Sequence, residues 1–310
     1  MVEEIRRLEK AVSKLELKDK RRSDFNRSVV NFLNSFIDDI DQAKGFENDF
    51  SSADEIFKIP FNDKGYPIED ILQLFDKAVI SNGIQAASGN HIGYIPGGGV
   101  PVAAYGDFIA AMTNKYSGIY YASPGAVNIE NHLLNWFADL FGFNKNTFGG
   151  NLTTGGSIAN LIAIVAARDK HEIRGKDFCK TVIYGSEQMH HCLHKAIRIS
   201  GLGECIFRNI SLDNTYHIDI NALELQLEKD LLNGLQPFLI IGSAGTTDTG
   251  VIDDLKALKK LADLNNCWFH VDAAYGGFFY MLEEFKEKYP GIDLADSLVI
   301  DPHKGLFLPY

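Results

Sequence analysis

HVDAAY at 270–275 and DPHKG at 301–305 are the two stretches of sequence that decide the fold. Each directly follows a short run of apolar residues, and such runs predict buried strands. In an open parallel sheet, the residues just past the strand ends line the ligand crevice. We therefore expect the carboxylate of Asp272 and the amine of Lys304 to meet at one site.

A lysine beside a fixed carboxylate suits one cofactor in particular, pyridoxal 5'-phosphate (PLP). The amine can combine with the aldehyde of PLP, and the carboxylate can keep the ring nitrogen protonated. The alternative is a buried salt bridge between Asp272 and Lys304. That alternative would explain these two residues, but not the further polar loops predicted at the same sheet edge.

Helical and strand patterns alternate from residue 150 onward, which predicts a mostly parallel sheet with helices on both faces. Residues 1–85 are expected to form an N-terminal helical segment that serves dimerisation, and residues 86–310 the α/β domain. The predicted helices are 101–117, 128–142, 157–170, 191–199, 221–232 and 253–265, and the predicted strands are 181–184, 204–208, 237–242, 267–271 and 297–300.

TTGGSIAN at 153–160 is a candidate phosphate site, because Gly156 and Ser157 come just before a helical pattern. Glycine lets backbone amides approach an anion, and a helix N-terminus attracts negative charge. The alternative is an ordinary capped helix after a turn. SAGTTDTG at 243–250 likewise offers small donors such as Thr246 at a strand end, or it is a plain loop whose next helix is capped by Asp253 or Asp254.

Histidines and a cysteine cluster in YGSEQMHHCLHKA at 184–196. Zinc binding is disfavoured there, because four ligands within five residues of one helical turn cannot converge on one ion. We predict no metal site. His190 can instead lie flat on an aromatic ring, while packing explains His191 and His194.

Composition limits the classes of function. The formal net charge of −11 argues against general nucleic-acid binding. No run of about 18 apolar residues is present, and the charged N-terminus excludes a signal peptide, so we expect no membrane association. The four cysteines lack CxxC spacing, which is typical of reduced thiols in a cytoplasmic protein. Residues 1–22 carry Ile5, Leu8, Val12 and Leu15 at helical spacing, which predicts an amphipathic helix that packs on a partner subunit.

These motifs, in this order, resemble the group II PLP-dependent amino acid decarboxylases, the family of aromatic amino acid, histidine and glutamate decarboxylases. The resemblance runs from about residue 85 to 310. It implies the large domain of the type I PLP-dependent transferase fold and decarboxylation of an L-amino acid to an amine. It also implies a homodimer with a shared active site.

The resemblance assigns roles to individual residues. Lys304 would bind the cofactor aldehyde, Asp272 would pair with the ring nitrogen, and His190 would stack on the ring. The remaining expected positions are Gly156, Ser157 and His303 near the phosphate, Thr246 near the cofactor, Ala274 against its ring, and Tyr94 and Pro96 in the substrate pocket.

Three departures from the family pattern qualify these expectations. The chain ends at Tyr310, so we expect the C-terminal small domain to be absent from it and the activity of these 310 residues alone to be doubtful. Gly305 stands where aromatic amino acid decarboxylases often have a bulky aromatic residue. Ile95 and the glycines at 97–99 differ from the aromatic-rich stretch of those enzymes. The substrate is therefore not specified by the sequence.

Three hypotheses follow. The first is an amino acid decarboxylase. The second is another PLP reaction on the same fold, by a lyase, an aldehyde synthase or an aminotransferase, because the cofactor loops do not fix which bond breaks. The third is a truncated, non-catalytic chain that acts by dimerising.

Overall fold

The computed structural model describes residues 1–13, 16–62, 64–95 and 97–310 and divides the chain into two compact units, 1–101 and 102–310. The boundary between the two compact units falls after residue 101. The domain boundary expected after residue 85 stays a prediction.

The first unit is mainly helical, as predicted for an N-terminal segment. It contains α1 (Val2–Val12), α2 (Asp19–Asp39), α3 (Ile68–Phe75) and an antiparallel pair of short strands, β1 (Phe46–Glu47) and β2 (Gly83–Ile84).

Helix α1 is shorter than the amphipathic helix expected over residues 1–22. It ends at Val12, and the next helix begins only at Asp19. The hydroxyl of Ser13 donates to the Lys10 carbonyl oxygen at 2.8 Å, a local bond that competes with continuation of the helix. Ile5 and Leu8 are exposed on α1, whereas Leu15 lies outside the described residues.

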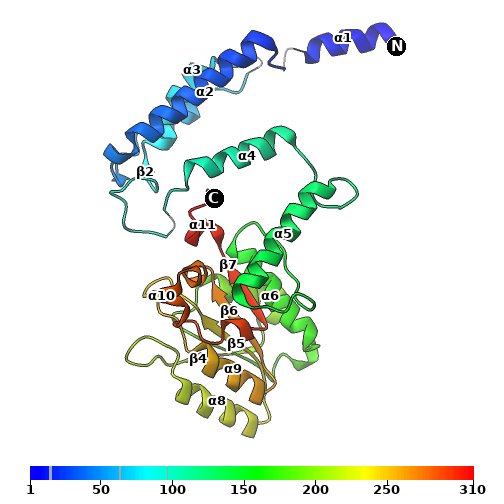
Figure 1. The fold of residues 1–310 in the computed structure, drawn as a ribbon, viewed down its shortest axis with the longest axis vertical. Helices are drawn as coiled ribbons and strands as arrows, with labels where there is room; N and C mark the ends of the chain where they lie inside the picture. Colours follow the sequence, from blue (N-terminus) through cyan, green and yellow to red (C-terminus); the bar gives the residue numbers. More distant parts are fainter. Residues whose placement is uncertain (14–15, 63, 96) are drawn as a thin grey trace. The chain divides into compact units, whose positions relative to one another are not determined.

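The second unit is built on a five-stranded sheet with the order β4-β3-β5-β6-β7 (Figure 1). Every neighbouring pair in this sheet is parallel. Its strands are β3 (Thr181–Ser186), β4 (Ile206–Ile210), β5 (Gln236–Ser243), β6 (Trp268–Ala273) and β7 (Ser297–Ile300). The predicted parallel α/β fold is confirmed.

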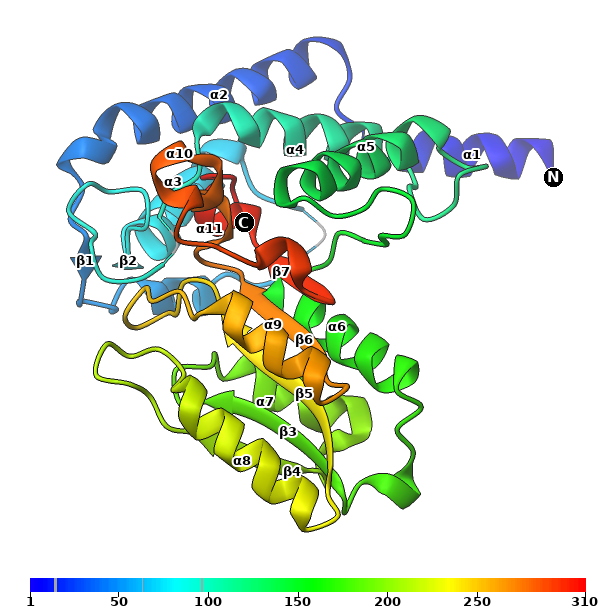
Figure 2. The ribbon, with the colours of Figure 1, turned by 60° about the horizontal axis from the view of Figure 1, so that its bottom comes forward.

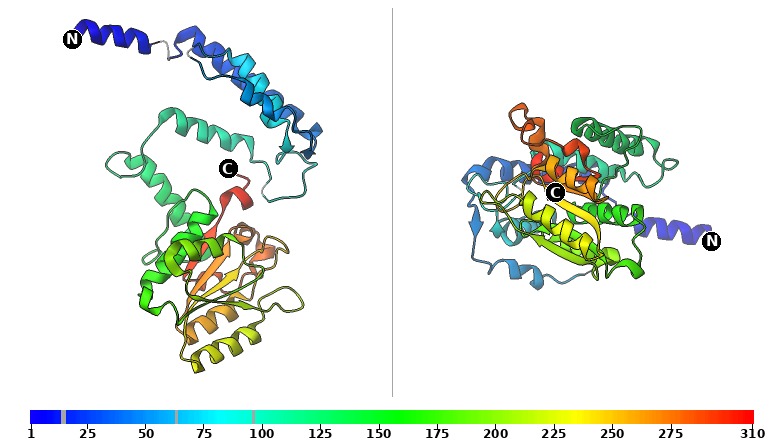
Figure 3. Two further views of the ribbon diagram at one scale, coloured as in Figure 1. Left: turned by 180° about the vertical axis from the view of Figure 1, so that it is seen from behind. Right: turned by 90° about the horizontal axis from the view of Figure 1, so that it is seen from below.

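Helices cover both faces of this sheet. The helices of this unit are α4 (Pro101–Thr113, which begins at the last residue of the first unit), α5 (Pro124–Phe141), α6 (Gly156–Lys170), α7 (Cys192–Ile197), α8 (Ile220–Leu232), α9 (Leu255–Leu264), α10 (Glu283–Lys286) and α11 (Pro302–Gly305). Helices α8 and α9 lie along one face (Figure 2), and α6 and α7 cover the other (Figure 3).

Two apolar clusters, one on each face, hold these layers together. On the α8 and α9 face, Leu223 and Leu258 pack with Phe269 of β6. On the α6 and α7 face, Ile164 and Leu193 pack with Leu239 of β5, and all are fully buried. Burying each such side chain contributes about 1.5–3 kcal/mol.

Two helix ends show the local causes that shift the predicted boundaries. Helix α4 stops at Thr113 because Asn114 adopts a left-handed conformation with φ of 46°. Helix α5 starts earlier than expected because Pro124 occupies its first turn, where the missing N–H costs nothing.

The strand order places a ligand crevice at the carboxyl ends of β3 and β5. From β3 the chain moves outward to β4 and then returns to the other side of β3 as β5, so the order reverses between β3 and β5. Ligands of open α/β sheets bind at such a reversal. Within the described ranges, no helix is both long and apolar enough to span a bilayer.

Candidate cofactor site

Asp272, near the carboxyl end of β6, and Lys304, just after β7, line one cavity at the carboxyl edge of the sheet. The two residues therefore meet at one site, as predicted. The loops after β3 and β5 and the start of α6 complete its wall. The lining residues are Thr154, Gly155, Gly156, Ser157, Asn160, Gln188, His190, Cys192, Ser243, Gly245, Thr246, Thr247, Asp272, Ala274, Tyr275, Asp301, Lys304 and Tyr310.

The Asp272 carboxylate is held from two sides. It is 7% exposed, its Oδ1 accepts from the Ala274 amide at 3.1 Å, and its Oδ2 lies 3.4 Å from Nδ2 of Asn160. A carboxylate held in this way presents a fixed negative charge to the cavity.

Lys304 reaches the cavity from α11, a single helical turn directly after β7. Asp301 caps this turn by accepting from the His303 amide at 3.1 Å, and Pro302 occupies its first position. The cap fixes where the chain turns after the strand and thereby where the lysine projects.

His190 lines the cavity after β3 as a neutral ring. Its Nδ1 accepts from the Cys192 amide at 3.3 Å, and burial lowers the pKa of the imidazole, with a smaller contribution from His191. Because Nδ1 is an acceptor, the proton of the neutral ring is on Nε2. A neutral flat ring can stack on an aromatic cofactor without adding charge.

The start of α6 presents backbone amides to the cavity. Gly155 precedes the helix with φ of 96°, a conformation that favours glycine, and Gly156 and Ser157 form the first turn. A side chain at Gly156 would lie 3.9 Å from Ala274 Cβ, so the loops are closely apposed. The arrangement suits an anion.

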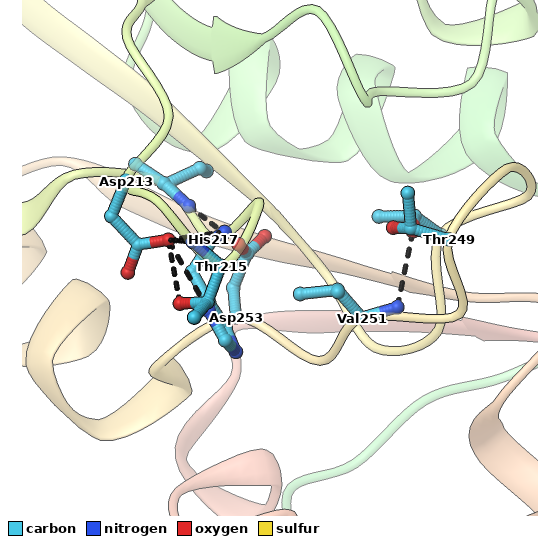
Figure 4. Close-up of polar contacts among 8 residues, drawn as sticks. Asp213, Thr215, His217, Thr249, Val251 and Asp253 are labelled. Carbon is cyan, nitrogen blue, oxygen red and sulfur yellow. Dashed lines mark hydrogen bonds and ion pairs between the residues drawn. The ribbon is translucent and has the colours of Figure 1, made fainter.

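Thr246 lies in the loop after β5, which turns back on itself beside the cavity. The Thr246 and Thr249 hydroxyls are 2.7 Å apart, and the Val251 amide donates to Thr246 Oγ1 at 3.2 Å. Figure 4 labels Thr249 and Val251 of this loop. Gly245 has φ of 94°, and a side chain there would come within 2.7 Å of Gly276. Close packing of two loops therefore requires glycine here.

The structure brings most predicted site residues together. Those that line the cavity are Gly156, Ser157, His190, Thr246, Asp272, Ala274 and Lys304. His303 is not among the lining residues, since its Nδ1 faces the Leu308 carbonyl oxygen at 2.9 Å. Tyr94 belongs to the first unit, where it is exposed and stacks on His91, and Pro96 lies outside the described residues. Their roles stay predictions.

Sequence reasoning did not single out Asn160, Gln188 or His270, and it considered Cys192 only as a disfavoured zinc ligand. Asn160 and His270 are buried polar residues inside an apolar helix and an apolar strand, respectively. His270 and Asp272 are two positions apart on one strand, so the sequence indicates that their side chains lie on the same face of the sheet. For Asn160, burial of a polar side chain becomes evident only once the helix is packed.

The cavity contains the groups that PLP needs. An amine, a buried carboxylate and a helix N-terminus converge there, and Gln188 Oε1 is buried with no hydrogen-bond partner among the described residues. An unpartnered buried oxygen costs about 1–3 kcal/mol unless something donates to it. These residues fit the cofactor. Across the part of the chain that the structure describes, no three His, Cys, Asp or Glu side chains gather as a metal site.

A parallel α/β sheet whose carboxyl edge carries this lysine, carboxylate and anion-binding turn defines a PLP-binding protein of the type I fold. Residues 54–309 match the model of the pyridoxal-dependent decarboxylase conserved domain. The chain belongs to the pyridoxal-dependent decarboxylase family, and the cofactor prediction is confirmed at the level of that family.

Curated relatives carry several enzyme names. An aromatic-L-amino-acid decarboxylase of Bacillus atrophaeus is 32% identical over 252 residues, which cover 81% of this chain and 52% of the relative. A 4-hydroxyphenylacetaldehyde synthase of Rhodiola rosea is 30% identical over 258 residues, or 80% of this chain and 52% of the relative.

Solved structures share the fold. The crystal structure of Oryza sativa TDC with PLP has a TM-score of 0.83 and 26% identity, over 94% of this chain and 65% of that one. The chain spans about half the length of the curated relatives it matches.

Proposed function

We propose that the whole protein is a PLP-dependent carboxy-lyase that converts an L-amino acid to its amine and carbon dioxide. The observation that carries the proposal is the convergence of Lys304, Asp272 and His190 in one cavity of a chain from the decarboxylase family. The substrate class is supported by the curated relatives, several of which are named as decarboxylases of aromatic amino acids.

Bound PLP would accept the electrons of the bond that breaks at the substrate α-carbon. The residues of this chain bind and orient it. Lys304 would supply the amine that holds the aldehyde, and Asp272 would keep a proton on the ring nitrogen. His190 would cover one ring face and exclude water. The first turn of α6 would bind the phosphate through its amides.

The test is Lys304→Ala in the whole protein. We expect loss of the visible absorption of lysine-bound PLP and loss of amine formation, because no other described lysine lines the cavity. Lys229→Ala, on α8, is the control and should leave both unchanged. An unaltered absorption spectrum in Lys304→Ala would remove the basis of the proposal.

Aldehyde formation is the second candidate, favoured by the likeness to the Rhodiola rosea synthase. Carbon dioxide and amine should be measured together across a panel of amino acids. Equal amounts of the two support the carboxy-lyase, whereas carbon dioxide without amine supports the aldehyde synthase. Folding and dimerisation of the whole protein without any turnover would support the non-catalytic alternative.

We further infer that the protein is a cytoplasmic homodimer. Helix α4 exposes an apolar stripe at helical spacing, formed by Val102, Tyr105, Ile109 and Met112, each more than half exposed. A stripe of this kind is typical of a surface that another chain covers. All four cysteines, which lie in the described part, are free thiols, as is usual in a reducing compartment.

A further inference from the structure

A line of polar side chains leads away from Asp272 along the face of the sheet that α6 covers. Trp268, His270 and Asp272 alternate along β6, so their side chains point to the same face. Asn160 of α6 and Ser297 of β7 complete the line. Asn160 and His270 are 1% and 0% exposed, so solvent cannot substitute for their hydrogen bonds.

Four short contacts connect these side chains. Asn160 Nδ2 lies 3.4 Å from Asp272 Oδ2, and Asn160 Oδ1 lies 2.8 Å from His270 Nε2. His270 Nδ1 lies 2.8 Å from Ser297 Oγ, and Trp268 Nε1 donates to the same oxygen at 2.8 Å.

The chemistry of the two ends fixes the direction of every bond. The Asp272 carboxylate only accepts, so Asn160 turns its NH₂ group toward it and its oxygen toward His270. His270 Nε2 therefore carries the proton. At the other end, the indole of Trp268 only donates, which leaves the Ser297 hydroxyl free to donate to His270 Nδ1.

A neutral His270 agrees with these directions. Full burial lowers the pKa of its imidazole to about 4, so the ring has one donor and one acceptor at neutral pH. Reversing Asn160 would place its amide oxygen against the carboxylate, with no donor between them.

We propose that Asn160 and His270 are positioning residues that hold the plane of the Asp272 carboxylate for the cofactor ring nitrogen. This inference rests on the proposed function, since it assumes that Asp272 pairs with PLP. Oδ1 is already held by the Ala274 amide. Loss of the second hydrogen bond would let the carboxylate rotate and weaken its pairing with the ring.

The test is the PLP dissociation constant of the whole protein, titrated from the apo form. Asn160→Leu has a similar size but no hydrogen bonds, and we expect it to weaken PLP binding roughly ten- to hundredfold. His270→Phe should weaken PLP binding by about tenfold or less, because it acts one bond further away. His270→Gln keeps a donor toward Asn160 and should restore most of the affinity. In turnover, kcat should fall while KM for the amino acid stays near the wild-type value.

A double-mutant cycle separates positioning from general stability. In an Asp272→Asn background, Asn160→Leu should change PLP affinity by less than about twofold if it acts through the carboxylate. Ser200→Ala is the control, because Ser200 is buried on the same face and its hydroxyl donates only to the Ile197 carbonyl oxygen. It should leave PLP affinity unchanged.

The outcomes distinguish failure of the positioning role from failure of the proposed PLP-dependent function. Wild-type protein that does not bind PLP would overturn the proposed function. Wild-type binding, together with an unaffected Asn160→Leu or with equal losses in both backgrounds, would overturn the positioning role alone. If Asn160→Leu does not fold, the effect of His270→Phe on PLP affinity is compared in the wild-type and Asp272→Asn backgrounds instead.

Discussion

His270 shows how burial of one residue links the site to the stability of the fold. Its pKa is lowered to about 4 by burial, against 6.5 in an unfolded chain. The unfolded state therefore takes up a proton near pH 6.5, whereas the folded state does not until about pH 4. Stability is unaffected above pH 6.5 and falls as the pH drops through this window.

We predict that His270 alone removes about 3 kcal/mol of unfolding free energy between pH 6.5 and pH 4. The measurement is chemical denaturation at a series of pH values in the apo protein. His270→Gln should flatten this part of the profile because glutamine does not titrate. The same acid loss in both proteins would assign it to other groups, such as His171 or His190, whose pKa values burial also lowers.

Gly305 illustrates how a departure from the family pattern can have a packing cause. A Cβ at Gly305 would lie 2.7 Å from Cβ of Phe278, which is 3% exposed. Phe278 thus fills the space beside the turn that carries Lys304, and no side chain fits at position 305.

Gly305→Ala should therefore destabilise the protein by about 1–3 kcal/mol through overpacking. Thermal unfolding of Gly305→Ala, Phe278→Gly and the double variant checks this. The double variant should lose less than the sum of the single losses, because Phe278→Gly removes the Cβ that a Cβ at position 305 would contact, together with the ring. Additive losses would mean that the two positions do not compete for space.

At the scale of elements, Asp230 joins α8 to two strands. Its carboxylate is fully buried and accepts from Tyr184 of β3 at 3.0 Å, from Arg208 of β4 at 2.7 and 3.1 Å, and from Gln226 at 2.9 Å. Burial alone would raise the pKa of Asp230, but these hydrogen bonds together bring it below its ordinary value.

Arg208→Leu should cost about 3 kcal/mol of unfolding free energy, because it leaves the Asp230 charge buried without its ion pair. Lys286→Ala is the matched control: it breaks an exposed pair with Glu283 and should cost less than about 1 kcal/mol. Denaturant titration measures both. If Arg208→Leu and Lys286→Ala cost similarly little unfolding free energy, the hydrogen bonds from Tyr184 and Gln226 are sufficient to stabilise the buried Asp230 carboxylate.

The loop that precedes α8 is tied to the end of β5 by a second carboxylate. Asp253 accepts from the Ile218 amide at 2.9 Å and the Ser243 amide at 2.8 Å, while Asp213 closes its own turn with Thr215 and His217 (Figure 4). The sequence offered Asp253 or Asp254 as the cap of α9. In the structure Asp254 caps α9, whereas Asp253 connects the loop before α8 to the end of β5 through its two hydrogen bonds. These bonds hold the β5 end, from which the Thr246 loop begins.

At the scale of the whole molecule, the proposed homodimer depends on the apolar stripe of α4. Ile109→Asp places a charge in the middle of this stripe and should shift the protein from dimer to monomer, because a buried unpaired charge is strongly disfavoured. Light scattering coupled to size exclusion measures the mass.

Leu225→Asp on α8 is the control for this prediction, since Leu225 is similarly exposed at 66% but lies outside the stripe. It should leave the mass unchanged. A dimer that persists in Ile109→Asp would place the interface elsewhere.

The sequence by itself determined the sheet, the order of its elements and the loops that carry Lys304, Asp272 and Ser157. It could do so because strand and helix periods are local properties, and because parallel strands must end at a common edge. The predicted end of the helix over 101–117 was wrong, because the helix stops at Thr113, where the next residue, Asn114, adopts a left-handed conformation.

Only the tertiary structure decided which polar side chains support the site. Asn160 and His270 are 110 positions apart, and nothing local to either one predicts that they are hydrogen bonded. Their pairing follows from how α6 packs on β6. The same holds for Gly305 and Phe278, whose contact is fixed by the turn after β7. Long-range packing chooses these partners, because burial makes each unpaired polar group and each overlap of atoms costly.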